Sequence, residues 1–134
     1  MTRPLGEDAA RLLDGPNFGF LATLMEDGAP KVEPVWVGRD GDLALVVTDG
    51  KSIKARNVAR DPRVALTVVA RSQPYEHLLI RGRVAEVRPD DDMAVLDAFS
   101  ERYLGGPYPR RRWSQRIVIA IAAHLVRYHA PAHR

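Results

Sequence analysis

The chain of 134 residues carries 20 lysines and arginines against 17 aspartates and glutamates, a formal net charge of +3. A hydrophobic content of 46% and a charged content of 28% are those of an ordinary soluble globular protein. The lack of cysteine excludes disulfides and thiolate metal sites. No apolar run approaches the ~18 residues of a transmembrane helix. We expect one cytoplasmic domain over residues 1–134, with its core at about 7–128 and a polar tail at 129–134.

Six apolar segments separated by short turns predict strands that pair in antiparallel order. They span 18–25, 31–38, 43–48, 63–70, 76–87 and 117–126. The first is apolar almost throughout, which predicts burial on both faces. Pro34 indicates an edge position or a bulge in the second, and Gly82 a bend in the fifth. Short helices are expected at 7–13, between Ser52 and Pro62, and at 90–103. The pattern is typical of a mainly β (α+β) fold, a small barrel or sandwich with two or three helices.

The stretch from Thr48 to Pro62 has the local geometry of an anion site. It follows an apolar strand, turns at Asp49-Gly50 and begins a short helix with Ser52 as a plausible N-cap. A strand end, a turn and a helix N-terminus then gather free backbone N–H groups and the positive end of a helix dipole. We interpret the stretch as a phosphate site.

The lysines support this interpretation. Only three are present, Lys31, Lys51 and Lys54, and two of them lie in this stretch. Lys51, Lys54 and Asn57 recur at i, i+3 and i+6, near one side of the helix. A compact ammonium suits a phosphate as a point charge. The alternative is a solvated basic helix face, the commoner fate of such charges.

Several catalytic motifs are excluded. Gly50-Lys51-Ser52 is similar to the end of a P-loop, but the first glycine of that motif would fall at Leu45. No Gly-x-Ser-x-Gly elbow occurs, and the histidines form no helical i, i+4 pair, so no metal site is expected. An enzyme with this sequence would need a cofactor to carry the reaction. Four aromatic residues could line a flat ligand or simply pack in the core and rim: Trp36, Tyr75, Tyr108 and Trp113.

The order of several segments resembles that of a known family. The segments are FGFLATL (18–24), DGAPKVEPVW (27–36), a strand ending in VVT (46–48), KSIKARNVARDPRVAL (51–66), IRGRVAEV (80–87) and ERYLGGPYP (101–109). Together they resemble the pyridoxamine 5′-phosphate oxidase-like split β-barrel family. Within it they are most similar to branch B of the flavin/deazaflavin (F420)-dependent oxidoreductases, of actinobacterial type. The resemblance covers about residues 7–128.

The resemblance implies a six-stranded antiparallel split β-barrel of the FMN-binding type, working as a homodimer with cofactor at the subunit interface. It implies contacts to cofactor phosphate or tail from Lys51, Ser52, Lys54 and Asn57. Thr48 would be a hydrogen-bonding group at the strand end. Lys31, Pro34, Val35 and Trp36 would lie along the strand beside the ring. Tyr108 and Trp113 would reach over from the second subunit.

The branch uses either FMN or coenzyme F420. Strict pyridoxamine phosphate oxidases carry an arginine-rich FMN motif where this chain has KVEPVW, and this departure favours F420. The anionic tail of F420 would suit a basic rim of Arg56, Arg60 and residues 110–112, which are otherwise solvated arginines. The expected function is an F420-dependent oxidoreductase that transfers a hydride between the deazaflavin and an unknown unsaturated small molecule. We assign no residue as acid or base.

Three alternatives stay open. The protein could be an FMN-binding flavoprotein of the same family, or a carrier that holds the cofactor without turnover. A nucleic-acid-binding barrel would fit the arginines at 110–112 near Tyr108 and Trp113. We place that last alternative behind the others because acids nearly balance bases.

Overall fold

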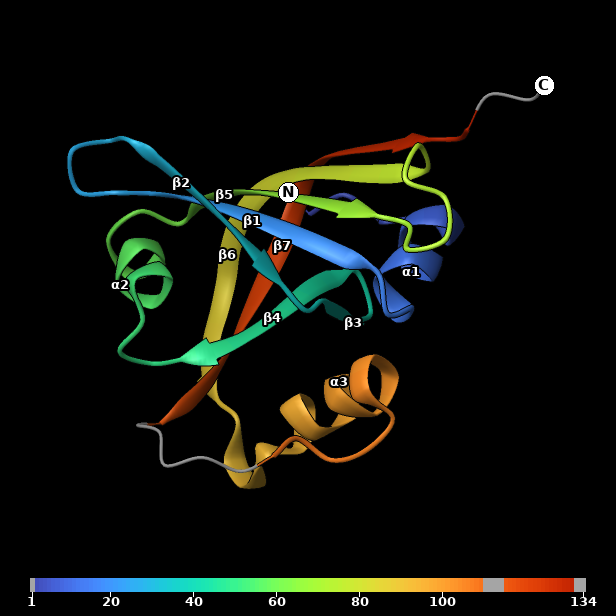
Figure 1. Cartoon of the computed structure of the whole chain (residues 1–134). Coiled ribbons are helices and arrows are strands. Elements are labelled where there is room, and N and C mark those ends of the chain that lie inside the picture. The colour runs from blue at the N-terminus through green and yellow to red at the C-terminus, as the bar shows by residue number, and fades with distance from the viewer. Residues whose placement is uncertain (1, 110–114, 132–134) are drawn as a thin grey trace.

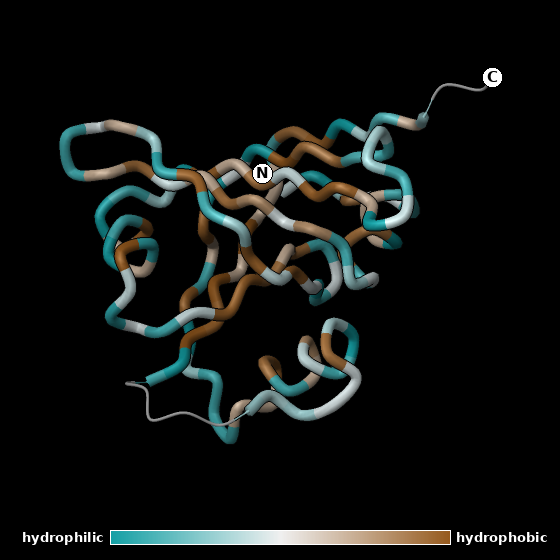
Figure 2. The backbone as a smooth tube through the Cα atoms, viewed as in Figure 1, coloured by the Kyte–Doolittle hydropathy of each residue, from teal (hydrophilic) through white to brown (hydrophobic). Residues whose placement is uncertain are grey.

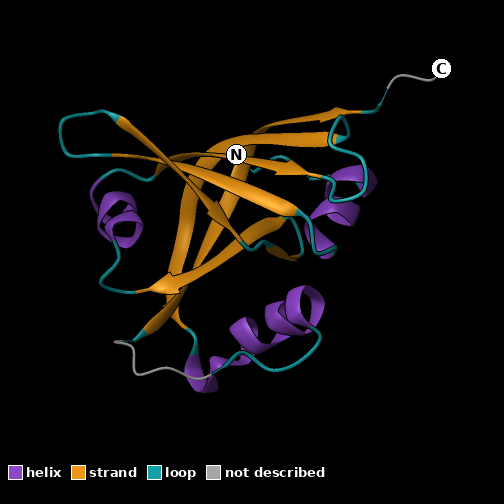
Figure 3. Cartoon of the chain, viewed as in Figure 1, coloured by secondary structure: helices purple, strands orange, loops and turns teal. Residues whose placement is uncertain are grey.

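The computed structural model describes residues 2–109 and 115–131, and its elements are β-strands, three α-helices and a 3-10 turn. In chain order they are α1 (Glu7–Asp14), β1 (Phe18–Leu24), β2 (Pro30–Val35), β3 (Gly38–Asp40), β4 (Leu43–Asp49), α2 (Ile53–Arg60), β5 (Arg63–Val69), β6 (His77–Pro89), the 3-10 turn η1 (Asp91–Met93), α3 (Ala94–Leu104) and β7 (Arg116–His129). Figure 1 labels these elements along the chain. The helices lie around the strands rather than between them (Figure 3).

The strands form one antiparallel sheet in the order β2-β1-β5-β6-β7-β4-β3. It has seven strands where six are predicted, because the chain leaves β2 after Val35 and pairs Gly38 with Leu45 as a separate short strand. The sheet is not closed, and β2 and β3 are its edges. Pro34 thus lies on an edge strand, as its missing N–H predicts. The prediction of a mainly β antiparallel fold with short helices is confirmed.

A bend in β6 lets the sheet curl. The pairing of β6 with β7 shifts register between Arg81 and Gly82. A Cβ atom on Gly82 would lie 2.0 Å from the carbonyl oxygen of Ala122. Only glycine allows this close approach of the two backbones, so the predicted bend at Gly82 is confirmed.

The core has two parts, and both draw on β4 and β7. The main cluster fills the curled sheet and is closed by Leu12 and Leu13 of α1. A smaller cluster on the opposite face of β4 and β7 packs Val118 against Phe99 of α3. Hydrophobic stretches accordingly run along the strands and recur on α3 (Figure 2). This smaller cluster forms an apolar layer between the sheet and α3, and the cleft described below borders it.

The prediction that the first strand is buried on both faces is wrong. Leu21 and Thr23 of β1 face the core, whereas Phe18 and Phe20 alternate to the outer face and are 51% and 38% exposed. The cause is one-sided packing: β1 lies between β2 and β5, and only its inward face packs in the core. None of the helices in the described part of the chain has the length and apolar character needed to cross a bilayer.

Candidate functional site

The turn between β4 and α2 is held by its own polar side chains. Ser52 is the N-cap of α2 and accepts a hydrogen bond from the backbone N–H of Ala55 at 3.1 Å, as predicted. The Thr48 hydroxyl donates to the Ser52 hydroxyl at 3.1 Å, and an Asp49 carboxylate oxygen accepts from the Lys51 N–H at 2.8 Å. This turn is therefore a preformed helix N-terminus, with Lys51 exposed beside it.

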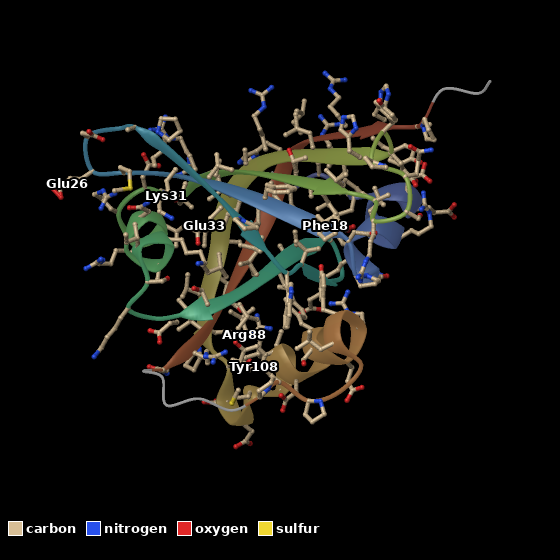
Figure 4. All side chains as sticks on the ribbon, in the orientation of Figure 1. Phe18, Glu26, Lys31, Glu33, Arg88 and Tyr108 are labelled. Atoms are coloured by element: carbon tan, nitrogen blue, oxygen red, sulfur yellow. The ribbon has the colours of Figure 1, made fainter. Side chains whose placement is uncertain are left out.

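A carboxylate of β2 joins two of the three lysines. Glu33 accepts hydrogen bonds from Lys54 of α2 at 2.6 Å and from Lys31 of its own strand. Burial acts to raise the pKa of Glu33, but the hydrogen bonds from Lys31 and Lys54 outweigh it and hold the pKa below its usual value. Lys31 and Glu33 lie on the side of the molecule that carries α2 (Figure 4). The fold thus assembles a cluster of two ammonium groups around one carboxylate.

A cleft of about 460 Å³ opens between the β1–β2 edge and α3. Its lining comprises Asn17, Phe18, Gly19, Phe20, Pro34, Val35, Trp36, Val47, Lys54, Leu96, Phe99, Tyr103, Tyr108 and Arg116. Apolar and aromatic side chains predominate, which is the character of a site for a flat organic ligand. Lys54 connects this cleft with the lysine cluster.

One wall of the cleft is a row of three aromatic rings. Trp36 stacks on Tyr103 with centroids 4.9 Å apart and planes 6° from parallel. Its other contact is with Tyr108, edge to face at 5.8 Å and 82°. Trp36 follows β2, Tyr103 belongs to α3 and Tyr108 lies in the segment after α3. It brings together rings that are distant in the sequence, and we call it the aromatic wall.

Hydrogen bonds from α3 to the loops beneath fix the aromatic wall. The Tyr103 hydroxyl donates to the carbonyl of Asn17 at 2.6 Å and accepts from the N–H of Val37 at 3.1 Å. Burial raises the pKa of Tyr103, which the Val37 N–H and the nearby Arg102 only partly offset. Arg102 donates to the carbonyls of Asp14 at 2.8 Å and Val37 at 2.9 Å. These bonds tie α3 to the chain on either side of the cleft.

The predicted site residues divide into those that line the cleft and those that do not. Lining it are Pro34, Val35, Trp36, Lys54 and Tyr108. Tyr108, for which the resemblance implies a reach from the second subunit, lines the cleft of its own chain. Outside the lining are Lys31, Thr48, Lys51, Ser52 and Asn57. Trp113 and the arginines at 110–112 lie outside the described residues.

Asn57 was predicted to contact the cofactor from the same side of the helix as Lys51 and Lys54, but the structure buries it. Its side chain is 2% exposed. The amide donates to the Thr23 hydroxyl at 3.0 Å and to the Met25 sulfur at 3.4 Å, and its oxygen accepts from Arg60 at 2.9 Å. Asn57 therefore pins α2 to β1. Steps of three residues fall short of the 3.6 residues in one helical turn, so positions i, i+3 and i+6 do not stay on one side of a helix. The third position, Asn57, therefore faces the sheet.

Nine cleft residues were not among the predicted site residues: Asn17, Phe18, Gly19, Phe20, Val47, Leu96, Phe99, Tyr103 and Arg116. Phe18 and Phe20 were assigned to a core. Tyr103 has the position of an ordinary residue in the last turn of a helix. Arg116 could have been found from its position, because it is a charged residue at the very start of an apolar strand. That position is informative only once the strand is known to be buried.

A family model matches nearly the whole chain. The model is that of pyridoxamine 5′-phosphate oxidase, and it matches residues 5–130. The chain therefore belongs to the pyridoxamine 5′-phosphate oxidase family, as its motifs indicate. The comparison with curated proteins found no match.

Solved structures share the fold. An F420 reductase is 31% identical, with a TM-score of 0.80 over 93% of this chain and 98% of that one. A conserved hypothetical protein from Mycobacterium tuberculosis is 24% identical, with a TM-score of 0.71 over 95% of this chain and 88% of that one. A putative pyridoxamine 5′-phosphate oxidase from Listeria innocua is 18% identical, with a TM-score of 0.63 over 83% and 86%. The last two establish similarity of fold alone, and the split-barrel prediction is confirmed.

Proposed function

We propose that the chain is a coenzyme F420-dependent oxidoreductase, of the actinobacterial branch B, that transfers a hydride between the deazaflavin and an unsaturated small molecule. The observation that carries the proposal is the aromatic cleft lined at one end by Lys54, which lies in the first turn of α2. A flat ring and an anionic chain are the two parts of such a cofactor, and the cleft and the lysine cluster suit one part each. The 31% identical F420 reductase supports the choice of cofactor.

The residues present fit a cofactor of this kind. Pro34, Val35 and Trp36 offer an apolar strand edge to a ring. Lys54, Lys31, Lys51 and the Ser52 end of α2 offer positive charge and backbone N–H groups to a phosphate. Thr48 and Asn57 hold the turn and the helix in place. The cofactor, when bound, supplies the hydride chemistry that no side chain of this chain can supply.

The protein would contribute orientation and exclusion of water. Trp36 contacts both Tyr103 and Tyr108 and forms a wall with them before any ligand binds, so little side-chain freedom is lost when a ring binds. The hydroxyl of Tyr103 is occupied by backbone groups. We therefore assign it to holding the wall and not to proton transfer.

FMN is the second candidate cofactor, and the match to the oxidase family favours it. It has the same flat ring and a single phosphate, so the same residues would serve. A carrier that binds either cofactor without turnover would also use this cleft. Reduction of an acceptor by loaded protein would argue against the carrier.

We further propose a cytoplasmic homodimer in which the second subunit covers the outer face of β1 and β2. Phe18 is 51%, Phe20 38% and Val32 64% exposed on these two strands. Clustered apolar exposure of this kind marks an association surface. Because Phe18 and Phe20 also line the cleft, a subunit placed there would border the cofactor. Light scattering should give twice the chain mass for wild type, and Val32→Glu should shift it toward monomer; monomeric wild type would refute the dimer.

The test of the function is a fluorescence titration of cofactor-free protein with F420 and, separately, with FMN. We expect F420 to bind more tightly and Lys54→Ala to weaken it at least tenfold. Arg81→Ala, which removes an exposed cation of β6 outside the proposed site, is the control and should change affinity less than threefold. Tighter FMN binding would move the protein to the flavin branch, and binding of neither would refute the proposal.

A further inference from the structure

A second cation lines the cleft besides Lys54. Arg116, the first residue of β7, is 7% exposed and borders the cleft. Among the described residues that line it, these two are cations and none is an aspartate or glutamate. A ligand in this cleft therefore meets positive charge from two different elements.

The register of the sheet explains why an arginine side chain enters this layer. Arg116 pairs with Asp49 at the ends of β7 and β4. Alternation puts it on the same face as Val118 and Ala120, which pack toward α3. Its guanidinium carbon lies 5.0 Å from the centroid of the Tyr108 ring. Arg116 thus stands at the end of the aromatic wall formed by Tyr103, Trp36 and Tyr108.

Arg116 is largely buried among polar and charged neighbours. Burial lowers the pKa of Arg116, and this outweighs the hydrogen bond and charge interaction with Tyr108 and the attraction of Asp49 and Asp90, which act to raise it. Asp49 also accepts from the N–H of Lys51, and Asp90 from those of Val95 and Leu96. A buried cation in such a field is stabilised by any anion that reaches it.

We propose that Arg116 is an anion-binding residue of the cleft, which receives a carboxylate or phosphate of a flat ligand lying along the aromatic wall. A planar guanidinium suits such a group through paired hydrogen bonds. The inference rests on the proposed function only in that the same cleft holds the ligand. The anion has two possible sources: the phosphate of the cofactor, or the carboxylate of a separate conjugated acid that would be the substrate.

Two pairs of probes of matched shape separate these sources. Cinnamate and cinnamamide are flat and conjugated and differ in charge; FMN and riboflavin differ by the phosphate. Dissociation constants are measured by calorimetry on cofactor-free protein for wild type, Arg116→Gln, Arg116→Lys and the control Arg81→Gln, an exposed cation of β6. Circular dichroism establishes folding of each variant.

For wild type and Arg81→Gln, we expect the dissociation constant of the anionic member of at least one pair to be at least tenfold lower than that of its neutral partner. Arg116→Gln should abolish that preference, and Arg116→Lys should keep part of it. If Arg116→Gln abolishes the preference for cinnamate over cinnamamide, Arg116 binds a substrate carboxylate. If it abolishes the preference for FMN over riboflavin, Arg116 binds the phosphate of the cofactor. Equal binding of both members of both pairs by wild type overturns the proposal even if Arg116→Gln does not fold. A preference that survives in folded Arg116→Gln also overturns it. The cinnamate arm needs no cofactor, so failure of F420 and FMN to bind is a separate result.

Discussion

The ammonium of Lys54 and the carboxylate of Glu33 are joined at 2.6 Å, although 21 residues and two different elements separate them. Lys31 contacts the same carboxylate. The cation proposed to hold a phosphate is therefore already paired with a carboxylate of the protein, which it shares with Lys31. An incoming anion must compete with Glu33, and this competition can be measured.

Replacing Glu33 by glutamine should tighten cofactor binding. The change removes a negative charge beside the proposed phosphate position and leaves Lys31 and Lys54 with a neutral partner. We expect the dissociation constant of F420 or FMN to fall about fivefold at low ionic strength, equivalent to ~1 kcal/mol, and less in high salt. Glu76→Gln removes an ion pair with Arg11 at the other end of the sheet and should leave affinity unchanged. Weaker binding by Glu33→Gln would instead mean that Glu33 positions Lys54.

The same pair should make stability depend on pH. Because the pKa of Glu33 is lower in the folded protein than its usual value, its ionised form stabilises the fold. This contribution is present above the unfolded-state pKa and is lost as pH falls through the folded-state pKa. Wild type should therefore exceed Glu33→Gln in free energy of unfolding by ~1 kcal/mol at pH 7, and the gap should close below about pH 4. Urea unfolding at a series of pH values measures it, and a gap independent of pH would contradict the assignment.

Asn57→Ala should destabilise the fold more than it weakens cofactor binding. It leaves Thr23 and Arg60 without the amide that they contact in a buried position, at a cost of about 1–3 kcal/mol. Arg56→Ala on the exposed side of α2 should cost little. Thermal unfolding gives the stability, and titration well below Tm gives the affinity. A folded Asn57→Ala protein that no longer binds cofactor would make Asn57 a direct contact.

Tyr103→Phe should loosen the aromatic wall. The hydroxyl serves Asn17 and Val37, so its removal leaves two part-buried backbone groups unsatisfied and should cost about 1–2 kcal/mol. Tyr75→Phe, at an exposed tyrosine, is the matched control. Burial raises the pKa of Tyr103 above the usual value near 10, so the alkaline absorbance titration of wild type should lose one of its late steps in Tyr103→Phe. A Tyr103→Phe protein as stable as wild type would show that the ring stack alone holds α3.

Gly82→Ala should be among the most damaging single-methyl additions. The added carbon would meet the Ala122 carbonyl oxygen at 2.0 Å, and backbone cannot give way without opening the β6–β7 pairing. We expect a loss of about 3 kcal/mol or more, or no folded protein. Gly106→Ala adds the same methyl where nothing lies within 4 Å, and its stability should match wild type. Equal stability of the two variants would refute the bend.

The sequence by itself determined the features that depend on neighbouring residues. The N-cap at Ser52, the edge location signalled by Pro34 and the bend at Gly82 follow from which backbone groups each residue can offer or tolerate. Strand and helix type followed from the spacing of apolar residues. These are short-range effects, so they can be read without knowing the fold.

Only the tertiary structure decided which side chains meet. Lys54 reaches Glu33 because β2 lies beside α2, and Trp36 stacks on Tyr103 because α3 folds back under β4 and β7. Arg116 enters the cleft through the register of β7, and Asn57 turns inward through the pitch of α2. In each case the partner is distant in the chain. Which face a residue presents depends on packing between elements, and no local pattern encodes that packing.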